Sequence, residues 1–222
     1  MKRRKWGLVF IRKQWNGWMF VLIVSVLLLT ALVMSLPEQG GNAFDRSMEA
    51  WMAGFKSDGM TVLFKLFSQL GSTIAIIGIT LISALVIGWM RGWLRGASFM
   101  AGVAAAYLLN SLLKMWIDRS RPAVAWGIEA DGASFPSANA MLAIVMYGLL
   151  ANMIIQSSSI RGGFKFAAIA VAALLILMMG LCRVYFHVHY LTDIMGGYAA
   201  GLAVISILMM ITYAFNKNRG AA

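Results

Sequence analysis

The sequence predicts an all-α membrane protein, a bundle of six transmembrane helices with a short interfacial amphipathic helix between the first two crossings. Of its 222 residues, 61% are hydrophobic and 12% are charged, against about 45–50% and about 25% in soluble domains. The mean hydropathy is +0.79. The length allows about six crossings of roughly 20 apolar residues each. These values exclude a disordered chain, a coiled coil and an ordinary water-soluble domain.

Six apolar stretches account for the predicted crossings. The first resembles a signal peptide, but its long basic lead-in and the lack of a small-x-small cleavage site favour a retained helix. The second is longer than a perpendicular span needs, so it either tilts or begins as an interfacial turn that breaks near Gly71-Ser72. No repeat or linker divides the chain, and we expect one domain over residues 1–222. The stretches cover residues 18–36, 60–90, 97–113, 137–155, 166–182 and 194–215.

Large apolar side chains recur at helical spacing between the first two stretches, with charged residues interleaved. The pattern is typical of a short amphipathic helix on the outer membrane interface. A loop helix packed against the bundle explains it equally well. The apolar residues are Phe44, Met48, Trp51, Met52 and Phe55.

The distribution of Lys and Arg predicts the orientation. Basic residues precede the first stretch and recur in the loops after the second and fourth and behind the sixth, whereas all eight Asp and Glu residues fall on the other side. Because basic loops stay inside, we expect a multi-pass protein of a bacterial-type cytoplasmic membrane with both termini cytoplasmic. The net charge of +11 then reflects orientation, and we expect the lipid bilayer, not nucleic acid, as the partner.

Three polar clusters lie at the predicted outer ends of helices. Charged groups at such positions are costly, which favours a functional explanation. The clusters are residues 114–122 after the third stretch, 134–139 before the fourth, and 182–193 between the fifth and sixth. The topology brings all three to the extracytoplasmic face, as one assembled site requires.

The residue types in these clusters favour an oxyanion ligand such as phosphate. Guanidinium groups match phosphate oxygens in a fork geometry. Pro136 and Ser137 fit the first turn of a helix with Ser134 as its N-cap, and free N–H groups there bind anions. The cationic donors are Lys114, Arg119, Arg121 and Arg183.

His189 and Asp193 are four residues apart, so on a helical turn the carboxylate can hold one imidazole nitrogen and leave the other nucleophilic. This pattern is typical of phosphoryl transfer through a histidine intermediate, with neither metal nor cofactor. Each residue alone has a plainer explanation: Lys114 as a snorkelling anchor, His187 as a structural residue, and Asp118 as a solvated acid or a partner for a nearby Arg. The combination favours a functional site.

The clusters resemble the signature of the type 2 phosphatidic acid phosphatase family, whose membrane members are lipid phosphatases. The family pattern is K-x6-R-P, then P-S-G-H, then S-R-x5-H-x3-D. The first motif is complete from Lys114 to Arg121-Pro122, and the third runs from Arg183 to Asp193 with Cys182 in place of serine. Six crossings with the site outside also agree with this family.

The resemblance implies a role for each matched residue. His189 would be the nucleophile, and Asp193 would orient it. Asn139 stands where the family has the histidine that protonates the leaving group, and Ala138 stands where it has glycine. The implied phosphate-binding residues are Lys114, Arg121, Ser137, Ala138 and Arg183.

Asn139 cannot act as a general acid, and losing such a group typically costs about 10²–10⁴-fold in rate. A lipid pyrophosphate expels a phosphate whose second pKa is about 6, so it needs this proton less than a monoester does. The hypothesis is therefore hydrolysis of an undecaprenyl-pyrophosphate-like lipid, with phosphatidylglycerophosphate or phosphatidate as alternatives. Water or His187 could also deliver the proton.

Two rivals to the enzyme hypothesis stay open. The first is a catalytically impaired relative that binds a phosphorylated lipid without turning it over, which Asn139 favours. The second is a small transporter or flippase. It is less well supported because the charged residues gather at one face and not at mid-membrane.

Overall fold

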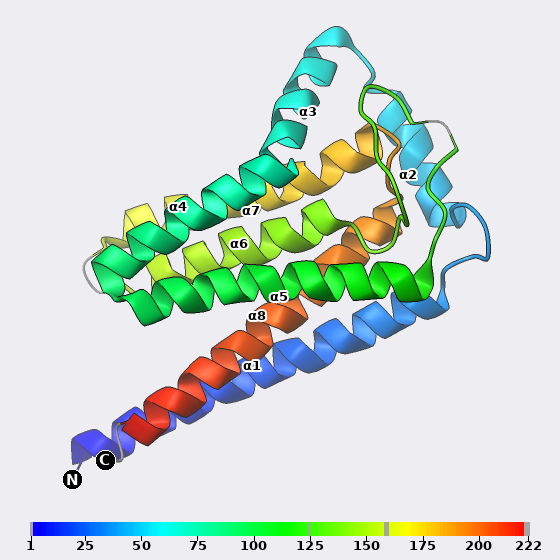
Figure 1. The fold of residues 1–222 in the computed structure, drawn as a ribbon. Helices are drawn as coiled ribbons and strands as arrows, with labels where there is room; N and C mark the ends of the chain where they lie inside the picture. Colours follow the sequence, from blue (N-terminus) through cyan, green and yellow to red (C-terminus); the bar gives the residue numbers. More distant parts are fainter. Residues whose placement is uncertain (1, 124, 158–159, 220–222) are drawn as a thin grey trace.

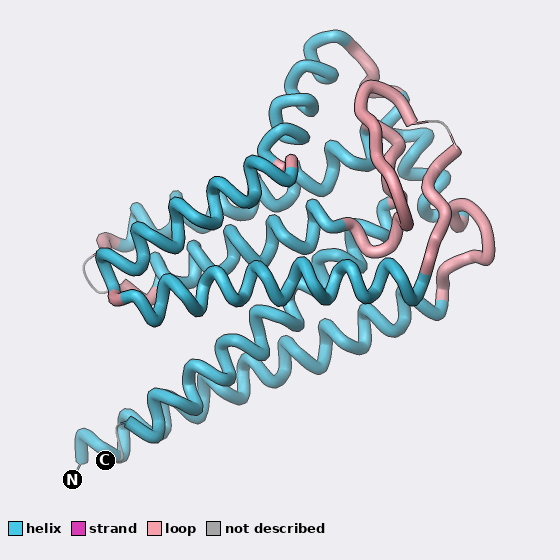
Figure 2. Tube along the Cα trace, in the orientation of Figure 1, coloured by secondary structure: helices cyan, strands magenta, loops and turns pink. Residues whose placement is uncertain are grey.

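The computed structural model describes residues 2–123, 125–157 and 160–219, and these contain eight helices and no strand (Figures 1 and 2). The all-α prediction is confirmed. The helices are α1 (Lys2–Met34), α2 (Ala43–Ala53), α3 (Asp58–Leu70), α4 (Thr73–Arg91), α5 (Trp93–Ile117), α6 (Ala138–Ile155), α7 (Gly162–Tyr185) and α8 (Leu191–Arg219).

Six of these helices are long and apolar enough to cross a membrane, and they match the six predicted stretches. They are α4, α5, α6 and α7 in full, residues 14–34 of α1 and residues 191–215 of α8. The second stretch breaks at Gly71-Ser72 as expected. The part before the break is the separate helix α3, and Ser72 begins α4 by accepting a hydrogen bond from the N–H of Ala75 at 3.2 Å.

The helices α4 to α7 lie side by side, while α8 crosses them and then runs along α1 (Figure 1). The start of α1 and the end of α8 lie together at one end of the molecule (Figure 1). The helix α2 and most of the loop structure lie at the other, and α3 stands steeply away from α4 (Figure 2). The long 118–137 connection belongs to this loop-rich end, where the polar clusters meet.

Small residues let α8 approach α6 closely at the start of both helices. A Cβ placed on Gly197 would lie 2.6 Å from the carbonyl oxygen of Ser137 and 3.1 Å from the backbone nitrogen of Met141. Helices in membranes associate largely through such close contacts. Nearby, the N–H of Ser137 donates to the carbonyl of Asp193 at 3.0 Å. The first turns of α6 and α8, which carry two of the polar clusters, are therefore fixed to each other.

We predict that Gly197→Ala lowers the free energy of unfolding by about 1–3 kcal/mol, because the added methyl group would have to displace the backbone of α6. Thermal unfolding in detergent measures the effect. Gly78→Ala in α4 is the matched control, since a Cβ there meets nothing within 4 Å. Equal stability of the two variants would contradict the close contact.

The helix α2 packs against the bundle, as one of the two predicted alternatives requires. One face packs against the bundle, where Asp45 and Met52 are buried, and the other exposes Phe44 and Trp51; Phe55 is exposed just beyond the end of the helix. The exposed aromatic side chains are typical of a membrane interface. The helix thus also anchors a buried carboxylate, Asp45, inside the loop-rich end.

Candidate active site

His189 lies in the tight connection between α7 and α8. The carbonyl of Arg183 accepts the N–H groups of Val188 and His189 at 3.1 and 3.3 Å, which turns the chain back at the end of α7. His189 therefore precedes α8 by two residues. The prediction that His189 and Asp193 share one helical turn is wrong. Asp193 is in the first turn of α8 and accepts the N–H of Tyr190 at 2.8 Å. This bond still brings the carboxylate to the imidazole.

The imidazole of His189 is buried and contacts a different partner with each nitrogen. Nδ1 lies 3.5 Å from Oδ2 of Asp193 and 3.2 Å from the hydroxyl of Ser134, which itself donates to Asp193 at 2.5 Å. Nε2 lies 3.2 Å from Nη1 of Arg121. Because a guanidinium only donates hydrogen bonds, Nε2 must accept. The proton therefore belongs on Nδ1, and Nε2 carries the lone pair.

The predicted capping of α6 is wrong in its details. Ser134 does not cap the helix, because its hydroxyl is engaged by Asp193 and His189, and Pro136 lies outside the first turn. The helix begins at Ala138 with Ser137 as its N-cap residue, and no side chain caps the first turn. The hydroxyl of Ser137 is buried and has no partner among the described residues. Both the hydroxyl and the first N–H groups of α6 are thus free to bind a ligand.

Arg183 also keeps an unused donor. Its Nε is buried without a partner in the described part of the chain. The side chain lines a cleft of about 510 Å³ together with Asn139 and Lys65. Buried donors are nearly always paired, so an acceptor is missing at Nε of Arg183 and at the hydroxyl of Ser137. Further lining residues are Ser68, Gln69, Gly71, Ser72, Thr73, Gly127, Ile128 and Glu129.

Arg121 and Lys114 lie around the same imidazole but bind backbone carbonyls. The ammonium group of Lys114 donates to Ala133 at 2.6 Å. A bound phosphate would have to replace some of these carbonyls as the acceptor of their hydrogen bonds. The guanidinium of Arg121 donates to the carbonyls of Asp131 at 2.8 Å, Gly132 at 2.9 Å and Val188 at 2.6 Å.

Asn139 connects two helices. Its amide nitrogen donates to the carbonyl of Gly71 at 3.0 Å, which joins the start of α6 to the junction between α3 and α4. A side chain on Gly71 would collide with this amide. Ala138, the first residue of α6, is half-buried beside it. Asn139 therefore shapes the wall of the cleft that contains Arg183.

His187 faces a second cleft, of about 400 Å³, and not the one that Asn139 lines. Arg46, Glu49 and Tyr190 share this second cleft, and no contact joins His187 to Asn139. We therefore assign His187 no part in proton transfer. Within the described ranges, no three His, Cys, Asp or Glu side chains come together as metal ligands do.

Arg119 does not have the role that the sequence suggested. Its two terminal nitrogens bind the carboxylates of Asp45 at 2.8 Å and Asp193 at 2.6 Å, so they are not free to hold phosphate. Its buried Nε has no partner among the described residues. Asp45 and Thr192 also border the site, which the sequence motifs did not predict. Ser134, predicted only as an N-cap, binds Asp193. The sequence did contain one indication that Asp45 is buried: it is an acidic residue among the apolar positions of α2. Asp118, by contrast, is exposed at the end of α5.

The buried imidazole should make stability depend on pH. Burial lowers the pKa of His189 from 6.5 to about 4, with Asp193 opposing the shift and Arg121 and Lys114 adding to it. An unfolded chain therefore binds a proton between about pH 6.5 and 4 that the folded chain does not. The stabilisation from the neutral imidazole is complete above about pH 6.5 and is lost as the pH falls through this window.

We predict that thermal unfolding midpoints show this loss. The chain has two histidines, so a His187→Gln background isolates His189. In that background the midpoint should fall more steeply from pH 7 to pH 4 than in the protein that also carries His189→Gln. Identical slopes would show that His189 is not buried in neutral form.

Six apolar helices and one polar, cation-rich cluster at their loop-rich end define a multi-pass helical membrane protein. Residues 95–217 match the PAP2 superfamily. The chain belongs to this superfamily, which confirms the resemblance found in the sequence motifs.

A similar protein sequence and a similar solved structure both come from Bacillus subtilis. Phosphatidylglycerophosphatase B is 27% identical over 191 residues, which are 86% of this chain and 90% of that protein. The crystal structure of a transmembrane PAP2 type phosphatidylglycerolphosphate phosphatase matches with a TM-score of 0.75 at 21% identity, covering 90% of this chain and 97% of the other. The fold is therefore that of a transmembrane PAP2 protein.

A further solved structure, Aquifex aeolicus LpxE, matches with a TM-score of 0.59 at 20% identity. The match covers 75% of this chain and 96% of LpxE. The relatives whose names describe an activity are phosphatases.

Proposed function

We propose that this protein is a membrane lipid phosphatase that acts through a phosphohistidine on His189 and favours lipid pyrophosphates of the undecaprenyl type. The observation that carries the proposal is the imidazole whose Nε2 lone pair lies beside Arg121 while Nδ1 is held by Asp193 and Ser134. Nε2 would attack phosphorus as the bond to the leaving oxygen breaks. Water would then cleave the P–N bond and release phosphate.

The cationic groups around His189 would bind the transferred phosphoryl group. The unpaired donors of Arg183 and Ser137 support this assignment, as do the uncapped N–H groups at Ala138, since a helix N-terminus attracts anions. Lys114 and Arg121 would contribute once their bonds to the loop carbonyls exchange for phosphate oxygens. Charge developing on those oxygens would then face preorganised donors.

Asn139 supports the choice of a pyrophosphate. An amide can hold a leaving oxygen by a hydrogen bond but cannot give it a proton, and a departing phosphate tolerates this better than a departing alkoxide. The distribution of Lys and Arg supports a site on the extracytoplasmic face of a bacterial-type cytoplasmic membrane, with both termini cytoplasmic. The lipid would therefore reach the site from the outer leaflet.

Phosphatidylglycerophosphate is the second candidate substrate. Bacillus subtilis phosphatidylglycerophosphatase B, named for this activity, is similar to 86% of the length of the present chain. As a monoester this lipid would need a proton source other than Asn139. A third possibility, a protein that binds phosphorylated lipid without turnover, predicts no release from any substrate.

Phosphate release from purified protein separates these candidates. We would compare farnesyl pyrophosphate, farnesyl phosphate and phosphatidylglycerophosphate at equal concentration in detergent without added divalent metal. The proposal expects release from the pyrophosphate at least about 10²-fold faster than from either monoester, the low end of the cost of a missing general acid. Faster release from phosphatidylglycerophosphate would establish the second candidate, and binding without release would establish the third.

A further inference from the structure

A buried ionic network joins α2 to the start of α8 at the loop-rich end. The carboxylate of Asp45 accepts a hydrogen bond from Nη2 of Arg119 at 2.8 Å. It also accepts hydrogen bonds from the backbone N–H and the hydroxyl of Thr192, both at 2.9 Å. Nη1 of Arg119 donates to Asp193 at 2.6 Å and to the hydroxyl of Thr192 at 2.7 Å. Arg119 also lies over the ring of Tyr190, 4.2 Å from its centre. The side chains of Asp45 and Asp193 are fully buried.

The network divides the two oxygens of Asp193. Oδ1 binds Arg119 alone, whereas Oδ2 accepts the hydroxyl of Ser134 and the N–H of Tyr190 and faces Nδ1 of His189. With partners on both oxygens, the carboxylate cannot rotate without breaking a buried charged hydrogen bond. Such bonds are strong in a low-dielectric interior. The orientation of the imidazole therefore depends on Arg119 through Asp193.

Asp45 fixes Arg119 in turn. Each terminal nitrogen of a buried guanidinium needs a hydrogen-bond acceptor, and Nη2 of Arg119 finds Asp45 at 2.8 Å and the carbonyl of Gly40 at 3.2 Å. Arg46 and Glu49, on the same helix, line the His187 cleft instead. The segment between the first two crossings thus brings the carboxylate of Asp45 next to the residues that hold Asp193. Asp45 lies 147 residues before its partner Thr192 in the sequence.

We propose that Arg119 and Asp45 are positioning residues for the reaction: they fix Asp193 so that it holds Nδ1–H of His189 and leaves the Nε2 lone pair for phosphorus. The inference rests on the proposed nucleophilic role of His189. It differs from a purely structural role, in which the network only fastens α2 to the bundle. The two are separable because only the first makes the tautomer of His189 depend on Arg119.

The tautomer is measured by nitrogen-15 NMR of histidine-labelled protein in a His187→Gln background, which leaves one imidazole. With Arg119 and Asp45 intact, we expect the proton on Nδ1. Arg119→Met should move a large share of the proton to Nε2, and Arg119→Lys should restore part of the Nδ1 form. Asp45→Asn, which keeps the size of the side chain, should give an intermediate shift and remains informative if Arg119→Met does not fold.

Met52→Ala is the matched control for loosening α2. Met52 is buried on the same helix but belongs to an apolar cluster with Ala140, Val184 and Ile194. The inference expects this variant to leave the tautomer unchanged at comparable thermal stability. A tautomer unchanged in folded Arg119→Met, or shifted equally by Met52→Ala, would overturn it.

Kinetics give a second readout. Arg119→Met should lower kcat by about 10²-fold, the cost of a misplaced reacting group, with a much smaller change in KM because Arg119 does not face the phosphate. Equal changes in KM and kcat would contradict positioning. Failure of the proposed function is distinct from this: it would appear as no His189-dependent phosphate release from the unsubstituted protein, while the tautomer still shifted in Arg119→Met.

Discussion

Replacing His189 by alanine should abolish phosphate release, lowering kcat by about 10³-fold or more for every lipid that the protein cleaves. Removing the imidazole removes the atom that bonds to phosphorus, and the structure offers no other unprotonated nitrogen between Arg121 and Asp193 among the described side chains. Release of inorganic phosphate under saturating substrate measures the loss. Because the cations remain, KM should change far less than kcat.

Two controls make this result specific. His187→Ala should keep most of the activity, since His187 lines another cleft. A brief incubation with radiolabelled substrate, quenched in base, should trap label on the unsubstituted protein and none on His189→Ala, as a phosphohistidine requires. Substantial turnover by His189→Ala, or label retained on it, would rule out His189 as the nucleophile.

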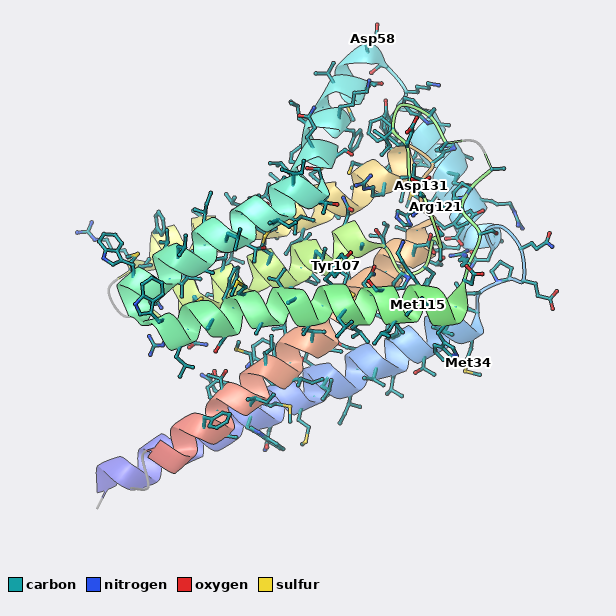
Figure 3. The ribbon with its side chains drawn as sticks, viewed as in Figure 1. Met34, Asp58, Tyr107, Met115, Arg121 and Asp131 are labelled. Atoms are coloured by element: carbon teal, nitrogen blue, oxygen red, sulfur yellow. The ribbon has the colours of Figure 1, made fainter. Side chains whose placement is uncertain are left out.

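The fold was predictable because it depends on properties that a sequence carries locally. A membrane helix needs about 20 apolar residues, and six stretches satisfied this. The break at Gly71-Ser72 was also predictable, since it joins a flexible residue to a good N-cap residue. The apolar pattern of residues 60–90 did not predict that the part before the break is a full helix, α3, which is angled away from α4 (Figure 3).

The partners of the site residues were much less predictable. The spacing of His189 and Asp193 indicated a contact, and the structure has one, though through the first turn of α8 and the bond to Tyr190. Arg119, by contrast, carries the same charge and lies in the same cluster as Arg121. Only the position of Asp45, on a helix far away in sequence, decides that Arg119 binds carboxylates. The charges and spacing of the residues in the sequence do not show that α2 brings Asp45 into contact with Arg119.

Ser134 and Ser137 show the same limit at closer range. Both precede α6 by a few residues, and either could have capped it by local rules. The structure selects Ser137 as the N-cap residue because Asp193 takes up the hydroxyl of Ser134 and also binds the N–H of Ser137 through its carbonyl. A tertiary contact with α8 therefore assigns these two roles.

Asn139→His should produce the largest gain of activity of any single substitution. For a lipid monophosphate we expect turnover to rise by about 10²–10⁴-fold, the range that a positioned general acid contributes. For a lipid pyrophosphate the rise should be much smaller, because the departing phosphate group does not need to be protonated as it leaves. Phosphate release from farnesyl phosphate and farnesyl pyrophosphate, measured side by side, gives the two ratios.

The gain with the monoester should also grow as the pH falls toward the ordinary histidine pKa of about 6.5, since only the protonated imidazole is an acid. Asn139→Gln is the matched control. It keeps an amide that can reach the carbonyl of Gly71, where Asn139 donates at 3.0 Å, but adds no titratable group, so it should not raise turnover. An equal gain for both substrates, or a gain in Asn139→Gln, would mean that residue 139 acts through the shape of the cleft and not through a proton, and the argument for a pyrophosphate substrate would lose its basis.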